Sequence, residues 1–492
     1  MFVGTGVLPG ISGGEKDIGS YSGEQTNGSI SDNGVLDVNY IYSLTRALSY
    51  IVFTEYDEEH GEIARGREFG TKGEHRAAEI LAENMTKLGL YTTMEKIENI
   101  PWVRSCSKLT HKTDVLDYKL VITNKTSGHS EIVDCSPCYS RIGPRDKPSE
   151  INYNFSYKGL KVRREHPPPK NDNEDYVLIS EGEFNKLVNP NRPTCDGLKF
   201  SLQFLGILQK SKREYYLHPH FKGYLSYGVN NDTHDQGANK YVPQFFINGS
   251  VGRRINSSAE DYSVDFYLKQ KLNKSVISYN VIGQLNGTDP SKTVIIDCLY
   301  DCWWDQGTAD SAIGMAMVLG VAKYFVEHSI KPKYNLKFIA FGGEEYGMRG
   351  AKYYEAAHKD ENIIYVIDLN QLGFRQEKPR LKLEIVTNKR KFTDEIWNVV
   401  KQTDYVNRTE NTADIKPFTL WMGHISDDRP FAMKRPFSCK TVCFLKGGQW
   451  LLHHRDGLNH TEGDVLKYFD WNDVGVTGEI VLNVTKYLTV DP

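Results

Sequence analysis

The chain has 492 residues, a net charge of −3 and 39% hydrophobic residues. This length exceeds what one ordinary hydrophobic core holds, so we expect at least two domains. The nearly balanced charge excludes the broad basic surface that is typical of nucleic-acid-binding proteins. No apolar run of about 18 residues predicts a membrane span.

Glycosylation sequons and cysteines bear on the compartment of the protein. Asn-x-Ser/Thr occurs twelve times, which is more often than this composition predicts by chance. The excess favours an extracellular or cell-surface protein, and the alternative is a chain that is simply rich in Asn, Ser and Thr. Met1–Gly10 lacks the basic start and apolar stretch of a signal peptide. The eight cysteines permit disulfides without requiring them, and the sequence leaves the oligomeric state open.

The N-terminal half divides by composition into three segments. Residues 1–34 are rich in Gly and Ser, and we expect them to be flexible. Residues 35–105 are expected to form the first part of an enzyme domain, with a helix that starts at a capping box and ends near a glycine. Residues 106–275 predict a β-rich insert with long Pro- and Asn-rich loops. The capping box is Thr71 and Glu74, the glycine is Gly89, and the clearest predicted strands of the insert are Tyr118–Thr123, Tyr176–Ser180, Tyr224–Tyr227 and Gln244–Ile247.

Residues 276–492 show strands and helices in alternation. The strands are nearly continuous apolar runs, which is typical of a mostly parallel sheet with helices on both faces. The sequence therefore predicts an α/β fold for this main part of the domain. The predicted elements are strands at Thr293–Leu299, Asn335–Phe341, Ile363–Leu369 and Thr441–Leu445, and helices at Ser311–Glu327, Met348–His358, Thr393–Lys401 and Val474–Leu488.

Five carboxylates stand at the ends of three successive predicted strands. Asp301 follows the first strand, and Asp310 opens the helix after it. Glu344 and Glu345 follow the second strand, and Asp368 ends the third. In parallel sheets these ends meet at one edge, so the acids would repel one another unless a positive group lay among them. A divalent cation is the economical explanation. The alternative is that polar residues are ordinary at strand ends.

Five motifs occur in an order that resembles a known family. They are Gly307–Gly314 (GTADSAIG), Phe341–Gly347 (FGGEEYG), Ile367–Asn370 (IDLN), Ser426–Phe431 (SDDRPF) and His460–Asp464 (HTEGD). Together they resemble the M28 family of zinc peptidases, and Gly70–Leu90 is similar to the N-terminal helix of that family. The insert, with Val242–Ile247 near its end, resembles the protease-associated domains found inside some members.

The resemblance implies a role for each matched residue. Asp310, Glu345 and His460 would bind one zinc ion, and Asp368 would belong to a second zinc site. Glu344 would be the catalytic base, which takes a proton from the attacking water and gives it to the leaving amine. Asp301 would support the metal ligands from behind, while Asp464 and Asp427 would be structural. Apart from the resemblance, Trp303 and Trp304 stand beside the presumed pocket in the sequence and are expected to contact the peptide substrate, and the alternative for these two is packing beneath a loop.

One position departs from the family pattern. The first motif of the family is His-x-Asp, and this chain has Leu299-Tyr300-Asp301. Leucine cannot bind a metal, so the second site would be weak or empty unless Asp301 or Asp297 substituted. We therefore expect a zinc-dependent exopeptidase with one tightly held zinc, most readily an aminopeptidase acting on peptides. Two alternatives remain open: a catalytically silent binding or receptor module, and a transferase similar to glutaminyl cyclases.

Overall fold

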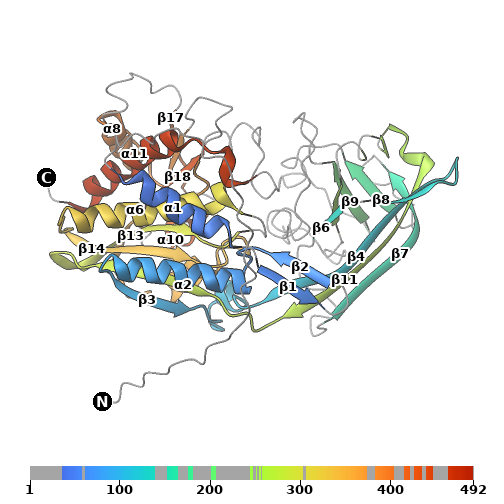
Figure 1. The fold of residues 1–492 in the computed structure, drawn as a ribbon, viewed down its shortest axis with the longest axis horizontal. Coiled ribbons are helices and arrows are strands. Elements are labelled where there is room, and N and C mark those ends of the chain that lie inside the picture. The colour runs from blue at the N-terminus through green and yellow to red at the C-terminus, as the bar shows by residue number, and fades with distance from the viewer. Residues whose placement is uncertain are drawn as a thin grey trace, which may run out of the picture.

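The described part of the chain forms two lobes, each built around its own β-sheet (Figure 1). The computed structural model describes residues 36–51, 53–57, 61–133, 135–138, 152–163, 176–180, 201–206, 244–247, 251, 254–255, 257–302, 306–373, 383–403, 415–421, 426–434, 439–446 and 464–490. The predicted flexible segment 1–34 and the predicted strand Tyr224–Tyr227 lie outside these residues.

The first lobe contains a mixed sheet with the strand order β17-β16-β18-β15-β13-β14-β12-β3. Its four central strands, β18, β15, β13 and β14, run parallel, which confirms the predicted mostly parallel sheet. The outer strands were harder to predict, because polar residues interrupt them. The bounds are β3 (Tyr91–Lys96), β12 (Tyr279–Leu285), β13 (Asp289–Leu299), β14 (Tyr334–Phe341), β15 (Ile363–Leu369), β16 (Leu383–Thr387), β17 (Ile415–Thr419) and β18 (Lys440–Lys446).

Helices cover both faces of this sheet. The helices α1, α2, α6, α8 and α11 contribute to the large hydrophobic core on one face, and α7 and α10 pack on the other. With the turn before it, α6 is long and apolar enough to cross a membrane, yet most of it is buried inside the described protein, as in a core helix. The bounds are α1 (Val38–Ser49), α2 (Lys72–Lys87), α6 (Ile313–Glu327), α7 (Arg349–Ala357), α8 (Arg390–Lys401), α10 (Arg429–Ala432) and α11 (Trp471–Thr489).

The predicted cap starts α2. The Thr71 hydroxyl accepts a hydrogen bond from the backbone amide of Glu74 at 3.3 Å, which satisfies one of the free amides of the first turn. The Glu74 carboxylate turns back and accepts from the amide of Gly70 at 2.6 Å, one residue before the amide that a capping box uses. Gly89 has a φ of 80° and ends the helix in the left-handed conformation, as predicted.

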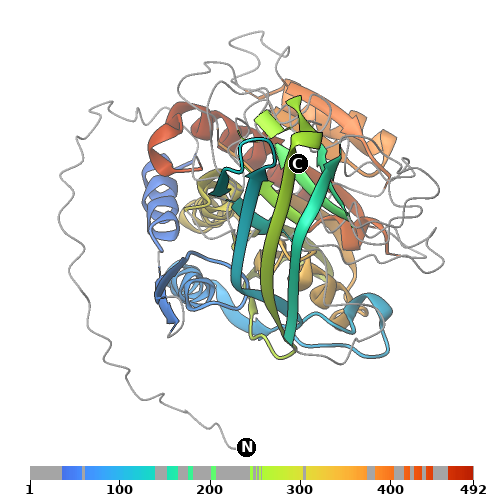
Figure 2. The same ribbon diagram turned by 90° about the vertical axis from the view of Figure 1, so that its right-hand side faces the viewer.

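The second lobe is a sheet with the order β5-β4-β11-β7-β8-β9-β10-β6. Figure 2 shows its long strands β4, β11 and β7 side by side. The chain enters this sheet at the first residue of β4, which pairs with the last residue of β11. The predicted limits of the insert, 106 and 275, stay a prediction. The bounds are β4 (Lys112–Asn124), β5 (Ser130–Ile132), β6 (Cys135–Cys138), β7 (Asn152–Arg163), β8 (Tyr176–Ser180), β9 (Ser201–Gly206), β10 (Gln244–Ile247) and β11 (Tyr262–Asn273).

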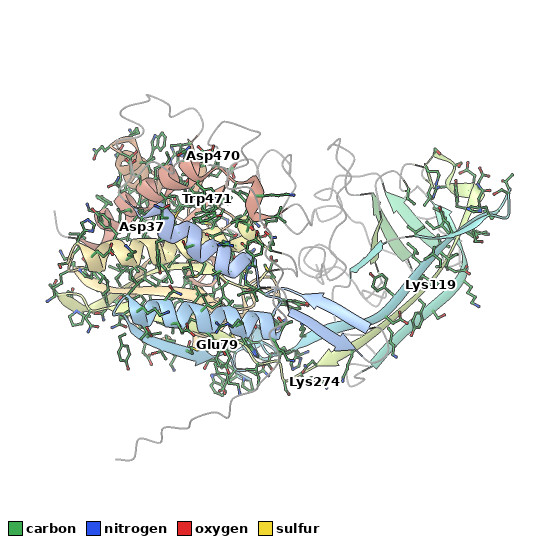
Figure 3. All side chains as sticks on the ribbon, viewed as in Figure 1. Asp37, Glu79, Lys119, Lys274, Asp470 and Trp471 are labelled. Carbon is green, nitrogen blue, oxygen red and sulfur yellow. The ribbon has the colours of Figure 1, made fainter. Side chains whose placement is uncertain are left out.

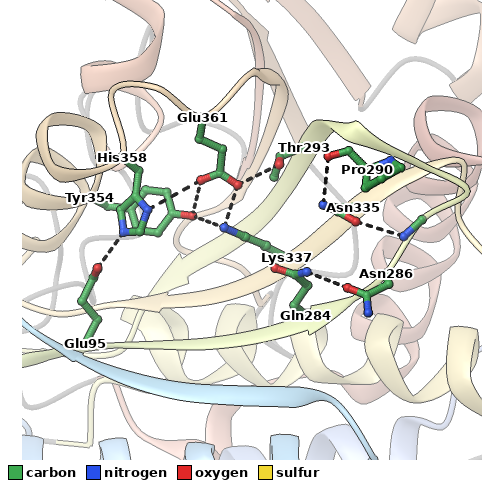
Figure 4. A network of polar contacts seen from close by, with 11 residues as sticks. Glu95, Gln284, Asn286, Pro290, Thr293, Asn335, Lys337, Tyr354, His358 and Glu361 are labelled. Atoms are coloured by element: carbon green, nitrogen blue, oxygen red, sulfur yellow. Dashed lines mark hydrogen bonds and ion pairs between the residues drawn. The ribbon is translucent and has the colours of Figure 1, made fainter. Parts of the chain in front are cut away.

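A polar network ties the sheet of the first lobe to α7 (Figure 4). Lys337 on β14 lies 2.6 Å from the Glu361 carboxylate and donates a hydrogen bond to the Tyr354 hydroxyl at 2.8 Å. Tyr354 and Thr293 donate to the two oxygens of Glu361 at 2.8 and 2.7 Å. Burial alone would raise the pKa of Glu361, but Lys337 and the hydroxyl donors outweigh it and hold the pKa below its usual value.

Removing the cation of this network is expected to destabilise the first lobe. Lys337→Met should lower the free energy of unfolding by about 3 kcal/mol at neutral pH, since it leaves Glu361 charged and largely buried. Because the folded-state pKa of Glu361 is depressed, its stabilisation is present above the ordinary pKa of 4.5 and disappears as the pH falls through the folded value. Denaturant titration should therefore show a difference between wild type and variant that shrinks in acid. The exposed pair of Lys87 and Glu83 provides the control Lys87→Met, which should change little; equal losses in both variants would contradict the prediction.

Candidate metal and catalytic site

The predicted acids gather where the central parallel strands end. Asp301 follows β13 by two residues, and Glu344 and Glu345 follow β14 by three and four. Asp310 lies in the tight turn η3 (Thr308–Ala312) that leads into α6. Asp301, Asp310 and Glu345 are all buried, with side chains that are 0, 3 and 8% exposed. The structure thus brings residues from three separate motifs to one edge of the sheet.

Asp301 holds the loop that carries the two glutamates. Its carboxylate oxygens accept hydrogen bonds from the backbone amides of Glu344 at 2.9 Å and Glu345 at 3.3 Å. Burial and the charge of Glu345 raise the pKa of Asp301 to about 8, although the two amides favour its charged form. The predicted supporting place of Asp301 therefore has a definite geometry: the end of β13 fixes the loop after β14.

Asp464 fixes the turn that contains Asp310. Its two carboxylate oxygens accept from the amides of Ala309 at 2.7 Å and Asp310 at 3.1 Å. Gln371 donates from its side-chain amide to Oδ2 of Asp310 at 3.0 Å. Because Asp464 is the last residue of the HTEGD motif, the contact places the end of that motif beside η3. His460, the predicted ligand in the same motif, lies outside the described residues.

The acids raise one another's proton affinity. Burial raises the pKa of Glu344 well above its usual value, and the charges of Glu345, Asp301, Asp310 and Asp368 add to the effect. So many carboxylates are costly to keep ionised in a buried place without a nearby positive charge. A divalent cation would remove that cost, and oxygen donors with one histidine suit zinc. The chemistry of these carboxylates, together with the histidine that the motifs predict, therefore suits a zinc ion.

Asp368 has surroundings unlike those of the other predicted ligands. It lies inside β15, opposite Asp297 of β13, and is fully buried. Burial raises the pKa of Asp368 to about 6, and no hydrogen bond to either of its carboxylate oxygens is found among the described residues. Beyond the end of the strand come Asn370 and then Gln371, and it is Gln371 that contacts Asp310. The assignment of Asp368 to a second zinc site stays a prediction.

Leu299, which stands where the family has its first histidine, also has apolar surroundings. Leu299 is fully buried in the hydrophobic core of the first lobe and adds no donor atom. Within the residues that the structure describes, no group of three His, Cys, Asp or Glu side chains is arranged to hold a metal ion. A complete ligand set would thus need His460. Trp303 and Trp304, the predicted substrate contacts, also lie outside the described residues.

Arg67 is a site residue that the sequence did not reveal. Its guanidinium is fully buried and donates to the carbonyls of Tyr300 at 2.8 Å, Gln306 at 2.8 Å and Gly307 at 3.0 Å. These carbonyls lie on both sides of the connection that starts at Asp301, so Arg67 holds its two ends together. No pattern could predict this, because every bond goes to backbone, which any residue provides.

The comparisons with known proteins agree with these motifs. Residues 280–485 match the model of "Peptidase family M28". A relative from Saccharomyces cerevisiae, "Putative zinc metalloprotease TRE2", is 27% identical over 154 residues. That alignment covers 28% of this chain and 19% of the relative, so the chain spans about a fifth of that protein's length.

The fold matches solved structures over nearly the whole chain. BSAP, a zinc aminopeptidase from Bacillus subtilis, superposes with a TM-score of 0.60 at 16% identity, covering 93% of this chain and 96% of that one. A peptidase M28 precursor from Shewanella amazonensis gives 0.61 at 14% identity and covers 92% of both chains. An aminopeptidase from Aneurinibacillus gives 0.56 at 15%, covering 93% of this chain and 96% of its own. At these identities the likeness shows the fold.

Proposed function

Because residues 280–485 match the model of peptidase family M28, we propose that this chain is a zinc-dependent exopeptidase that removes residues from the N-termini of peptides. One observation carries the proposal: the carboxylate of Asp301 binds the amides of Glu344 and Glu345 and so fixes both glutamates at the strand ends where Asp310 lies. A base and metal ligands need this kind of rigid support. The aminopeptidase folds of the solved relatives favour action at the N-terminus.

Asp310, Glu345 and His460 would hold the zinc ion. When bound, zinc would supply a Lewis acid that polarises the scissile carbonyl and makes water a better nucleophile near neutral pH. Glu344 would accept the proton of the attacking water and then deliver it to the leaving amine. With Leu299 in the hydrophobic core, a second site would have only Asp310 and Asp368. We therefore propose one tightly held zinc per chain.

A panel of peptides tests the reaction. The zinc-loaded protein is incubated with free peptides, with N-blocked peptides and with peptides that begin with glutamine. The proposal expects loss of residues from free N-termini only. Release of residues from C-termini would instead identify a carboxypeptidase, and ring closure of the N-terminal glutamine would identify a transferase. If no peptide is changed and the zinc-loaded protein behaves as Glu344→Gln does, the chain is a silent binding module, the reading that Leu299 favours.

The support by Asp301 predicts a second measurable effect. Asp301→Asn keeps the shape of the side chain but replaces one of its two accepting oxygens with an NH2 group, so that one of the amides of Glu344 and Glu345 loses its acceptor. We expect kcat/KM for a cleaved peptide to fall roughly 10- to 100-fold, as is usual when a group that orients metal ligands is changed. Asp297→Asn is the matched control, since Asp297 is equally buried and no hydrogen bond to either of its oxygens is found among the described residues. Equal activities of the two variants would contradict the role of Asp301.

A further inference from the structure

The two chain segments that cross between the lobes are bonded to each other. The outgoing crossing is residues 108–112, and the returning crossing is residues 273–278. The amide of Val276 donates to the carbonyl of Thr110 at 3.0 Å, and the Thr110 hydroxyl donates to the carbonyl of Lys274 at 2.8 Å. Figure 3 labels Lys274 at this junction, where the two lobes meet. The crossings therefore form one connected unit.

The outgoing crossing holds one end of the catalytic loop, which we define as residues 342–349. Arg349 donates from Nε to the carbonyl of Tyr346 at 2.8 Å. Its other nitrogens donate to the carbonyls of Lys108 and His111, the latter at 3.4 Å. One guanidinium thus joins the residue directly after Glu345 to the segment that leads into the second lobe.

A buried ion pair makes a second connection to the same place. Lys112, the first residue of β4, lies 3.1 Å from the carboxylate of Glu68, and the two side chains are only 4 and 0% exposed. The Tyr346 hydroxyl donates to the same carboxylate at 2.5 Å. The ammonium group of Lys112 also lies 5.7 Å from the centre of the Tyr346 ring. A shift of β4 would therefore be felt at Tyr346, since a buried charge pair is costly to separate.

The returning crossing holds the other end of the catalytic loop. The Ser278 hydroxyl donates to the Glu74 carboxylate at 2.7 Å. A methyl group added at Gly342 would lie 2.5 Å from the Ser278 oxygen and 2.6 Å from the carbonyl oxygen of Tyr279. The loop and the crossing thus approach so closely that only glycine fits. Both ends of the catalytic loop rest on the junction of the lobes.

We propose that Lys112 and Tyr346 are positioning residues, which make the placement of the catalytic loop depend on the placement of the β-rich second lobe. Neither would touch the substrate. Lys112 acts through Glu68 on Tyr346, whose backbone is continuous with Glu345 and the base Glu344. A bound peptide that draws the second lobe closer, or holds it in place, would thereby bring Glu344 into its position for reaction. The expected effect on catalysis rests on the proposed exopeptidase function, whereas the connection from Lys112 through Glu68 to Tyr346 does not.

The test compares substitutions that differ only in whether the ion pair survives. Lys112→Met removes the charge, Lys112→Arg keeps it, and Lys119→Met changes an exposed lysine of the same strand. Hydrogen exchange in the full-length protein follows amides of the catalytic loop that are bonded within it, such as Gly347 and Met348, which donate to the carbonyl of Glu344 at 2.7 and 2.8 Å. In parallel, kcat and KM are measured for a peptide that the wild type cleaves.

Lys112→Met should speed exchange of these loop amides roughly tenfold. It should also lower kcat roughly tenfold or more with little change in KM, because misplacing a catalytic group costs rate more than binding. Lys112→Arg and Lys119→Met should match the wild type. Tyr346→Phe should act in the same direction as Lys112→Met, and it decides the matter if Lys112→Met does not fold. It removes one hydroxyl while keeping the contact with Phe69, whose ring centre lies 5.2 Å away.

The outcomes separate this inference from the proposed function. Faster loop exchange in Lys112→Met and Tyr346→Phe, in a protein that cleaves no peptide, would keep the connection and overturn the exopeptidase. A wild type that cleaves peptides, with unchanged exchange and unchanged kcat in both variants, would overturn the connection alone. Equal effects of Lys112→Met and Lys119→Met would also overturn it, since Lys119 takes no part in the buried pair.

Discussion

Glu344→Gln is expected to lower kcat for peptide cleavage by roughly a thousandfold while leaving the fold and the bound zinc in place. The glutamine side chain has the same shape but cannot accept the proton of the attacking water, and general bases commonly contribute 10²- to 10⁴-fold. Glutamine also removes one charge from a crowded group of buried acids, so the variant should unfold no more easily than the wild type.

The control for this prediction lies on the following helix. Glu355→Gln changes a partly exposed glutamate that pairs with Lys434 at 3.3 Å, away from the strand ends. It should keep the kcat of the wild type. Steady-state kinetics with one peptide, together with thermal unfolding of all three proteins, are sufficient. A Glu344→Gln protein that retains more than about a tenth of the wild-type kcat would exclude Glu344 as the base.

Asp310→Ala is expected to abolish zinc binding and, with it, peptide cleavage. The proposed zinc has three protein ligands, and removing one leaves an incomplete site. The loss follows from the ligand and not from the turn, because Asp464 would still accept the backbone amides of residues 309 and 310. After dialysis, metal analysis should find less than roughly a tenth of the wild-type zinc.

Asp427→Asn serves as the matched control for Asp310→Ala. Asp427 is fully buried near the same acids, and the described residues supply no hydrogen bond to its two oxygens. Burial and the charges of Glu344 and Asp368 raise the pKa of Asp427 well above its usual value, so the amide resembles the form already present. This variant should keep its zinc. If instead Asp427→Asn lost zinc and Asp310→Ala retained it, the ligand assignment would be wrong.

The sequence predicted the central strands well, because strands buried on both faces are continuous apolar runs. The predicted strand Thr293–Leu299 lies within β13, and the predicted strand Ile363–Leu369 coincides with β15. The long strand β7 (Asn152–Arg163) was not predicted, since its alternating polar residues resemble those of the loops around it. The strand β7 forms because it pairs with its neighbours in the sheet, and pairing between segments that are distant in the sequence leaves little trace in a local sequence pattern.

The candidate site was predictable only where function requires a particular side chain. Asp310, Glu344 and Glu345 were singled out because acids recur at three successive predicted strand ends and because these residues lie in motifs that resemble a known family. Arg67 was missed because it binds backbone carbonyls that any residue would offer. The junction at Lys112 was missed for another reason: its partners Glu68 and Tyr346 are far away in the sequence, and no local pattern indicates that the three side chains meet.

The most direct test of the account is the number of zinc ions held by the purified wild-type protein. Metal analysis after dialysis should find one zinc per chain, and zinc should return to one per chain when it is restored after chelation. Two tightly held zinc ions would contradict the loss of a site at Leu299, and no zinc at all would contradict the metal centre of Asp310, Glu345 and His460.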